Sequence, residues 1–252
     1  MRAGYLLMKP ILLLAPFALA GCATLFGPKS PFALDRKGEL VESNYAWSAE
    51  ASADPTLVRR LRSDLETSFS AASTTAQADR AAAQAAKRPF NGHQFSRHWT
   101  TAGQSSRLLS LSGETLVSAG GAQPSHGADA LLWDRLTRRE IKVERLFSAG
   151  DDLEKLVRAP FCVTLQGERA KRRGAPVQAG DAFSACPQLR ELAVVPADSN
   201  TNRRFDRFRL IAPNGVAGAY AEGRYDIAVA VTPALRAALK PAYRSSFEVQ
   251  PQ

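Results

Sequence analysis

Acidic side chains are the residues of this 252-residue sequence that could carry out acid–base catalysis. Asp151, Asp152 or Glu222 could act as the acid or base of a wall-modifying hydrolase, but no partner group stands at a useful spacing from them. The acids at 151 and 152 are also typical of a helix N-terminus. The sequence contains neither a Gly-x-Ser-x-Gly nor a His-Glu-x-x-His motif. We therefore predict a protein that is not an enzyme.

Metal binding is the other chemistry that the residue types allow. The run Asp198–Asn202 begins like a calcium loop, with oxygen donors on alternate residues, but Arg203 and Arg209 replace the required glycine and glutamate. We expect a polar turn there. His93 and His98 are five residues apart and therefore do not share a strand face. We expect all three histidines, His93, His98 and His126, at the surface or at strand edges rather than on zinc. No metal and no cofactor is predicted.

Residues 1–21 have the features of a secretion signal. Arg2 and Lys9 precede an apolar stretch over residues 11–19, and small residues follow it. This stretch is shorter than the roughly 20 apolar residues of a membrane-spanning helix, and Pro16 interrupts it. We predict a cleaved signal peptide rather than a transmembrane anchor.

The thiol of Cys22 stands where this signal would be cut. Leu19-Ala20-Gly21-Cys22 resembles the bacterial lipobox, whose small residues fit the lipoprotein signal peptidase and whose cysteine is acylated. The resemblance implies a lipid on Cys22 that anchors the protein to a membrane; an ordinary secreted protein with a chance cysteine is the alternative. In the lipobox family an aspartate after the cysteine favours the inner membrane, so Ala23 points to the outer membrane, facing the periplasm. Residues 22–36, with their Gly and Pro, would form a short tether.

Two further cysteines, Cys162 and Cys186, remain once Cys22 is assigned to lipid. In an oxidising compartment such a pair normally forms a disulfide, and neither residue has a neighbouring histidine or second cysteine that would favour a metal or redox role. We predict a Cys162–Cys186 disulfide that contributes roughly 3 kcal/mol to stability by the chain-entropy estimate.

The formal charge of the whole chain is +9. Basic proteins often bind nucleic acid, but an exported protein rarely meets it, so we predict no nucleic-acid partner. Anionic lipid head groups and cell-wall polymers are the available partners. The densest basic segment, residues 169–173, is interpreted as a solvated helix end, where cations complement the helix dipole.

Hydrophobic spacing predicts an α+β fold. A strand over 40–51 precedes a long helix that starts at Asp54-Pro55, and residues 89–147 read as an antiparallel meander with hairpin turns at 112–114 and 137–139. A helix from Asp152 is expected to end or kink at Pro160. Strands at 192–195, 205–211 and 225–231 and a short helix at 233–239 complete the pattern. We expect an antiparallel sheet with helices packed on one side.

Two glycine-containing turns stand out from this pattern. Glycines there suit positive φ at strand ends, and the turns could equally face a ligand. The residues that we nominate as ligand-facing are Gly120, Gly121, Gln123, Pro124, Tyr220, Glu222 and Gly223. The order of motifs resembles the RsiV-like extracellular C-terminal domain family, in Gly120 to Pro124, Leu146-Phe147 with Leu153 and Leu156, and Tyr220 to Gly223.

This resemblance implies an RsiV-like domain over residues 111–252, preceded by a small α/β segment with the long helix over 37–110. Gln123 stands where the family has a histidine, and the two cysteines lie in an insertion, so a role that depends on that histidine does not carry over. The best-known members sense lysozyme, but this chain is basic, and like-charge repulsion disfavours that partner.

The sequence thus predicts a membrane-anchored, non-enzymatic lipoprotein that binds peptidoglycan or a periplasmic protein. Peptidoglycan, with its peptide carboxylates, suits the positive charge better than lysozyme does. The alternatives are a cell-wall-modifying enzyme and a structural or assembly lipoprotein.

Overall fold

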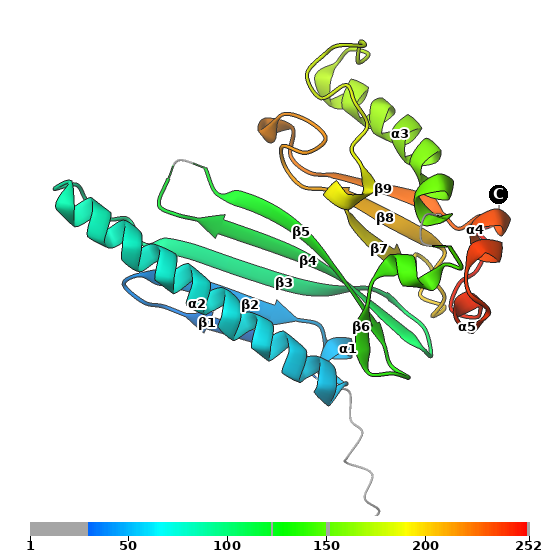
Figure 1. The fold of residues 1–252 in the computed structure, drawn as a ribbon, viewed down its shortest axis with the longest axis horizontal. Coiled ribbons are helices and arrows are strands. Elements are labelled where there is room, and N and C mark those ends of the chain that lie inside the picture. The colour runs from blue at the N-terminus through cyan, green and yellow to red at the C-terminus, as the bar shows by residue number, and fades with distance from the viewer. Residues whose placement is uncertain (1–29, 122, 150–151, 251–252) are drawn as a thin grey trace, which may run out of the picture.

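A computed structural model describes residues 30–121, 123–149 and 152–250 and confirms the α+β class (Figure 1). Two sheets form its framework. The first has six strands in the order β1-β2-β3-β4-β5-β6, and the second has three in the order β7-β8-β9. The first sheet comprises β1 (Phe32–Arg36), β2 (Val41–Trp47), β3 (His93–Gln104), β4 (Leu108–Ser118), β5 (Ser125–Asp134) and β6 (Arg139–Ile141). The second comprises β7 (Ala193–Ala197), β8 (Arg207–Ala212) and β9 (Tyr225–Ala230).

The helices complete the architecture. The two long helices are α2 (Pro55–Ala85) and α3 (Asp152–Arg173). The short ones are α1 (Ala49–Ser52), α4 (Pro233–Ala238) and α5 (Pro241–Arg244), together with the 3-10 turns η1 (Val143–Leu146), η2 (Leu189–Glu191) and η3 (Tyr220–Glu222). No helix in the described part of the chain is both long enough and apolar enough to span a bilayer.

Helix α2 covers one face of the six-stranded sheet. Asp54 caps its N-terminus by accepting hydrogen bonds from the amides of Thr56 and Leu57, and a proline occupies the first turn. Residues at helical spacing, Leu57, Leu61 and Leu65, are buried against sheet residues such as Trp47 and Trp99. The helix is continuous through residue 85 because this apolar stripe and the alanines that follow it both favour helix.

The three-stranded sheet lies between the six-stranded sheet and α3. Four apolar side chains of α3, spaced four residues apart, lie in the hydrophobic core between this helix and the small sheet: Leu153, Val157, Phe161 and Leu165. The buried Arg169 continues the same row. The other face of the small sheet, through Val195 and Ile211, packs on Ala102 and Ala128 of the large sheet. The layers therefore run α2, six-stranded sheet, three-stranded sheet, α3.

Four local expectations differ from the structure. The large sheet is mixed, because β2 and β3 are parallel and α2 makes the crossover between them. Residues 112–114 lie inside β4 and form no turn; a Cβ on Gly113 would stand 2.8 Å from the Trp99 ring, so close packing requires glycine there. Helix α3 does not end at Pro160, one of the two outcomes that we expected there, and continues through it because the buried stripe extends on both sides. The boundary that we placed between residues 110 and 111 lies within β4, whose two halves share one sheet.

Candidate functional site

The two glycine-containing turns, far apart in sequence, meet in the structure. The first joins β4 to β5 and the second contains η3, just before β9. The hydroxyl of Tyr220 donates a hydrogen bond to the carbonyl oxygen of Pro124, and the rings of Tyr220 and His126 are 6.3 Å apart. Gly120 and Gly223 have φ of 73° and 74°, as their expected place at strand ends requires. Gly121 and Gln123 are exposed on the same β4–β5 turn.

A polar depression lies beside this contact, on the face of the six-stranded sheet opposite α2. Its first pocket, of about 210 Å³, is bounded by the sheet and by the segment between β8 and β9, which contributes Asn214, with Arg224 just before β9. A second pocket, of about 220 Å³, continues from it over β2 and β3. The two share Ser96 and Leu116. We call the combined surface the sheet-face groove.

Strand register explains why the groove is continuous. Asn44, Ser96, Leu116 and His126 are successive partners across β2, β3, β4 and β5. Because alternate residues of a strand point to the same face, this row lies opposite the side chains that pack on α2. The row covers three inter-strand spacings, about 14 Å.

Charges of both signs line the groove. Glu114 forms an ion pair with Arg224 across the first pocket, and Lys37 and Glu42 line the second. His98 contacts the side-chain oxygen of Asn44 on the neighbouring strand. The groove therefore offers hydrogen-bond donors, acceptors and both charges rather than the uniformly positive surface that the composition suggests.

The basic end of α3 holds one wall of the groove. Arg169 is fully buried and donates to the carbonyl oxygens of Ala217, Ser184 and Ala185 at 2.7, 3.2 and 2.9 Å. Arg172 donates to two carbonyls at residues 222 and 224. The interpretation of residues 169–173 as a solvated helix end is wrong for Arg169, which is buried and has backbone carbonyls as its partners. Arg172 is exposed although it also donates to backbone carbonyls.

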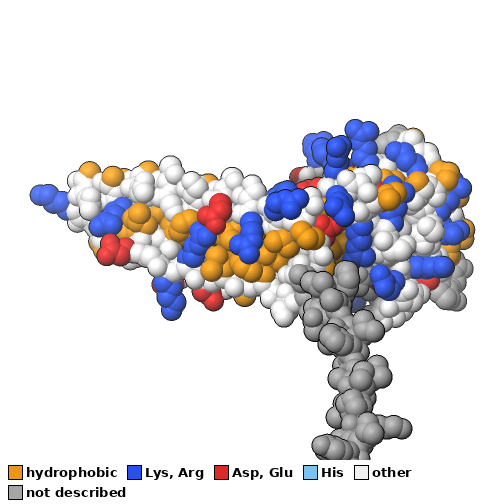
Figure 2. All heavy atoms as spheres, turned by 90° about the horizontal axis from the view of Figure 1, so that it is seen from below, with side chains coloured by type: hydrophobic (Ala, Val, Ile, Leu, Met, Phe, Trp, Pro, Cys, Tyr) orange, Lys and Arg blue, Asp and Glu red, His pale blue; other side chains and the backbone are white. Residues whose placement is uncertain are grey.

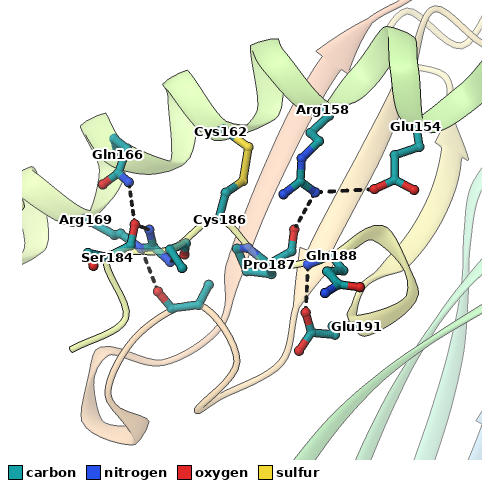
Figure 3. Close-up of a disulfide and its surroundings, with 12 residues drawn as sticks. Glu154, Arg158, Cys162, Gln166, Arg169, Ser184, Cys186, Pro187, Gln188 and Glu191 are labelled. Atoms are coloured by element: carbon teal, nitrogen blue, oxygen red, sulfur yellow. Dashed lines mark hydrogen bonds and ion pairs between the residues drawn. A yellow bond between two sulfur atoms is a disulfide. The ribbon is translucent and has the colours of Figure 1, made fainter. Parts of the chain in front are cut away.

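The predicted disulfide is present and supports the same wall. Cys162 on α3 is bonded to Cys186, 24 residues further along the chain (Figure 3). It holds the segment that contributes two of the carbonyl oxygens bound by Arg169. Gln166 also donates to the Ser184 carbonyl, at 2.8 Å. The disulfide therefore holds the segment at residues 184–186 beside Arg169, and Arg169 in turn binds the carbonyl oxygen of Ala217.

Glu222 is a structural carboxylate. Burial alone raises the pKa of its carboxyl, but hydrogen bonds from the Tyr225 hydroxyl, the Ala219 amide and Arg173 outweigh that effect, and the net pKa is lowered. A general acid requires the opposite shift. Asp152 accepts a hydrogen bond from the Ala149 amide near the start of α3. Asp151 and Cys22 lie outside the described residues.

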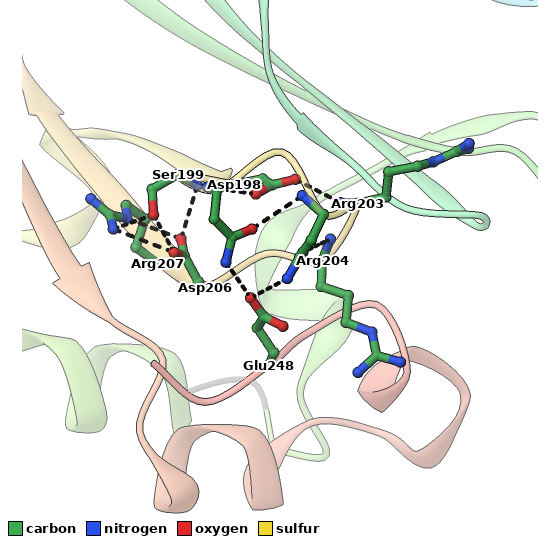
Figure 4. A network of polar contacts seen from close by, with 9 residues as sticks. Asp198, Ser199, Arg203, Arg204, Asp206, Arg207 and Glu248 are labelled. Carbon is green, nitrogen blue, oxygen red and sulfur yellow. Dashed lines mark hydrogen bonds and ion pairs between the residues drawn. The ribbon is translucent and has the colours of Figure 1, made fainter. Parts of the chain in front are cut away.

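The polar run at 198–202 forms a turn in which side-chain oxygens accept hydrogen bonds from backbone amides of the same turn (Figure 4). Asp198 accepts from the amides of Asn200 and Arg203, and Asn200 accepts from the amide of Asn202. The Asn200 and Asn202 side chains donate to Glu248. These oxygens are thus occupied by the turn itself. Within the described ranges, no group of three or more His, Cys, Asp or Glu side chains is placed to bind a metal ion.

Sequence reasoning nominated the two turns but missed most of the groove between them. His98, Glu114, His126, Asn214 and Arg224 line it. A usable signal was the polar side of β3, where Gln94, Ser96 and His98 alternate with buried neighbours. Of the predicted site residues, Tyr220 and Pro124 contact each other. Glu222 accepts a hydrogen bond from the Ala219 amide in the turn that contains Tyr220. The Cys162–Cys186 disulfide stabilises the neighbouring segment that Arg169 binds.

The fold is thus an α+β fold in which a six-stranded and a three-stranded sheet are packed between the long helices α2 and α3. Solved structures with a similar fold include two proteins of the DUF3298 family. One is a DUF3298 family protein from Pseudomonas aeruginosa PAO1, with a TM-score of 0.53 and 15% identity over 89% of this chain and 99% of that one. The other is a member of the DUF3298 family from Bacteroides fragilis NCTC 9343, with a TM-score of 0.50 and 11% identity over 86% and 95%.

These similarities establish the fold and nothing finer, since the identities are low. They extend over more of the chain than residues 111–252, so the shared fold includes strands on both sides of the boundary that we predicted. No family model matches the sequence, and a search of curated proteins finds no significant relative. The RsiV-like resemblance is compatible with these neighbours and stays a prediction.

Proposed function

We propose that the protein is an outer-membrane lipoprotein, anchored through Cys22, whose sheet-face groove binds peptidoglycan in the periplasm without catalysing a reaction. The observation that carries the binding part is the continuous row of Asn44, Ser96, Leu116 and His126 across four strands. An open row of this kind accommodates an extended polymer better than an enclosed small molecule.

The chemistry of the groove suits peptidoglycan. Its stem peptides carry carboxylates and can carry amines, and its sugars carry hydroxyl and acetamido groups. Lys37 can bind a carboxylate, Glu42 can bind an amine, and the polar side chains of the row can hydrogen-bond to amides. Glu114 and Arg224 form an ion pair with each other, and a ligand with both charges could replace each partner of that pair. A groove of mixed charge matches a ligand of mixed charge.

Binding is favoured over hydrolysis because both carboxyl oxygens of Glu222, the carboxylate that we considered as an acid or base, already accept hydrogen bonds from Arg173, the Ala219 amide and the Tyr225 hydroxyl, and the lowered pKa of this carboxyl disfavours the role of an acid. It also braces a turn whose displacement would alter the groove wall. The enzymatic alternative therefore needs a different acid, and activity on purified cell wall is the measurement that would support it.

A wall-binding assay tests the groove. Ser96 lines both pockets, so Ser96→Trp should fill their junction and reduce co-sedimentation with purified peptidoglycan at least about tenfold, equivalent to ~1.4 kcal/mol. Val163→Trp, at a 75% exposed position on α3, is the matched control and should bind like the parent protein. Both variants must retain the parental unfolding midpoint. Equal binding by the two variants would refute the groove, and no binding by the parent protein would refute peptidoglycan as the ligand.

The anchor is tested separately by metabolic labelling with radioactive palmitate. The parent chain should incorporate label and fractionate with the outer membrane, whereas Cys22→Ser should incorporate none. Label that persists in Cys22→Ser would disprove acylation at this residue.

A further inference from the structure

The β5–β6 hairpin carries an exposed apolar side chain among arginines at its tip. Leu136 is 75% exposed, and Arg138 and Arg139 follow it. Within the described residues, the side chains of these two arginines form no ion pair. An exposed apolar side chain can enter the interface of a bilayer, and arginines beside it can contact anionic phosphates.

The tip is held rigidly, so Leu136 cannot fold back onto the protein without breaking several contacts. The buried Asp134 accepts hydrogen bonds from the backbone amides of Leu136 and Thr137, at 2.9 and 3.3 Å, and forms an ion pair with Arg107. Arg135 donates to the Ser105 carbonyl and to the Gln104 side chain. The exposure of Leu136 is therefore a property of the folded turn.

Arginines gather around the tip together with carboxylates. Burial lowers the pKa of Arg135 and the charge of Arg203 lowers it further, so Arg203 is another cation close to the hairpin; Asp54 and Glu50 act in the opposite direction. Of the carboxylates that face this end, Glu140 is paired with Arg60 at 3.0 Å. Glu50 accepts from Thr101, and Asp54 caps α2 and accepts from the Trp133 indole.

The hairpin and the start of the folded chain lie at the same end of the large sheet. Phe32, at the start of β1, stacks on Trp47 with ring centroids 3.7 Å apart, and the Arg62 guanidinium lies over its ring. Arg60, two residues before Arg62 on α2, donates a hydrogen bond to Glu140 on β6. Figure 2 shows Lys and Arg side chains spread over this face, together with hydrophobic side chains and fewer acidic ones. Ser30 follows Cys22 by eight positions along the chain, a reach of at most about 28 Å.

We propose that the tip of the β5–β6 hairpin docks on anionic phospholipid, with Leu136 entering the interface and Arg138 and Arg139 contacting phosphates. The inference rests on the proposed lipid anchor, which would hold this end of the domain within reach of the bilayer. Acyl chain and hairpin then form two points of attachment. Two points restrict the orientation of the domain, where one acyl chain alone leaves it free to rotate.

Depth-dependent fluorescence quenching tests the docking. Leu136→Trp and Val163→Trp place an indole at two positions that are each 75% exposed, on the hairpin and on α3. The full acylated protein is reconstituted into vesicles with brominated acyl chains, made either of phosphatidylglycerol with phosphatidylcholine or of phosphatidylcholine alone. The parent protein supplies the background of its own tryptophans. Leu136→Trp should be quenched and blue-shifted in the anionic vesicles, and Val163→Trp should not.

Charge neutralisation supplies the second test. Adding Arg138→Gln and Arg139→Gln to Leu136→Trp should reduce the docked-to-undocked ratio about fivefold for each arginine. Acylated protein with no quenching at position 136, or with equal quenching at 136 and 163, would overturn the hairpin docking. A chain that is not acylated but whose position 136 is still quenched in anionic vesicles would refute the anchor and retain the hairpin.

Discussion

The Tyr220 hydroxyl donates a hydrogen bond to the Pro124 carbonyl oxygen, and this contact joins the two turns that frame the sheet-face groove. Tyr220 precedes the last strand of the small sheet, whereas Pro124 belongs to a hairpin of the large sheet. The groove therefore depends on how the two sheets are held together.

Tyr220→Phe should loosen the contact between the two turns. Loss of one hydrogen bond should lower the free energy of unfolding by about 1 kcal/mol and speed amide exchange at residues 120–127. Weaker peptidoglycan binding should accompany it. Gln123→Ala, on the same turn but exposed and without a hydrogen bond in the described structure, is the control for the fold and should change neither the free energy of unfolding nor the amide exchange. Unchanged exchange in Tyr220→Phe would show that the contact does not hold the turns.

Arg169→Ala should destabilise the fold far more than its position in a basic run suggests. It removes three hydrogen bonds from buried or half-buried carbonyl oxygens, so the free energy of unfolding should fall by about 3 kcal/mol in chemical denaturation. Lys171→Ala, at a 73% exposed side chain two residues away, should be nearly neutral. Similar small effects for both variants would restore the solvated-helix interpretation.

Asp64 on α2 should make stability depend on pH. Burial alone raises the pKa of its carboxyl, but hydrogen bonds from Tyr45 and Arg97, at 2.6 and 2.9 Å, outweigh that effect and lower the net pKa. A lowered pKa in the folded state contributes stability that is fully present above the unfolded pKa of about 3.9 and is lost as pH falls through the folded value.

Denaturation of Asp64→Asn against pH measures this contribution. The variant should be less stable than the parent by about 2 kcal/mol at pH 7, and the difference should narrow as pH falls below about 4. Glu66→Gln removes an exposed ion pair with Arg36 and should cause a much smaller difference at every pH. A gap for Asp64→Asn that stays constant into acid would contradict the assignment.

The double variant Cys162→Ala and Cys186→Ala should lose roughly 3 kcal/mol of stability, because the disulfide closes a loop between residues 24 positions apart. Reducing agent should lower the unfolding midpoint of the parent protein and leave that of the double variant unchanged. If the reductant also lowered the unfolding midpoint of the double variant, its effect on the parent protein could not be assigned to the Cys162–Cys186 disulfide.

Helices and most strands could be predicted because their signals are local. Asp54-Pro55 and the leucines of α2 define that helix by capping and spacing alone, and the alternating polar residues of β3 indicate a strand with one open face. Gly113 shows where local signals fail. Glycine commonly marks a turn, but here it gives room to Trp99, a residue that only the sheet register brings near.

By itself the sequence determined the α+β class, the pairing of Cys162 with Cys186 and the two turns that carry Tyr220 and Pro124. Tertiary structure alone decided that these turns touch, that Arg169 is buried beneath them and that a polar row crosses four strands. The reason is physical: capping, periodicity and turn preferences act within about ten residues along the chain, whereas register and sheet stacking depend on contacts between residues as far apart as Pro124 and Tyr220.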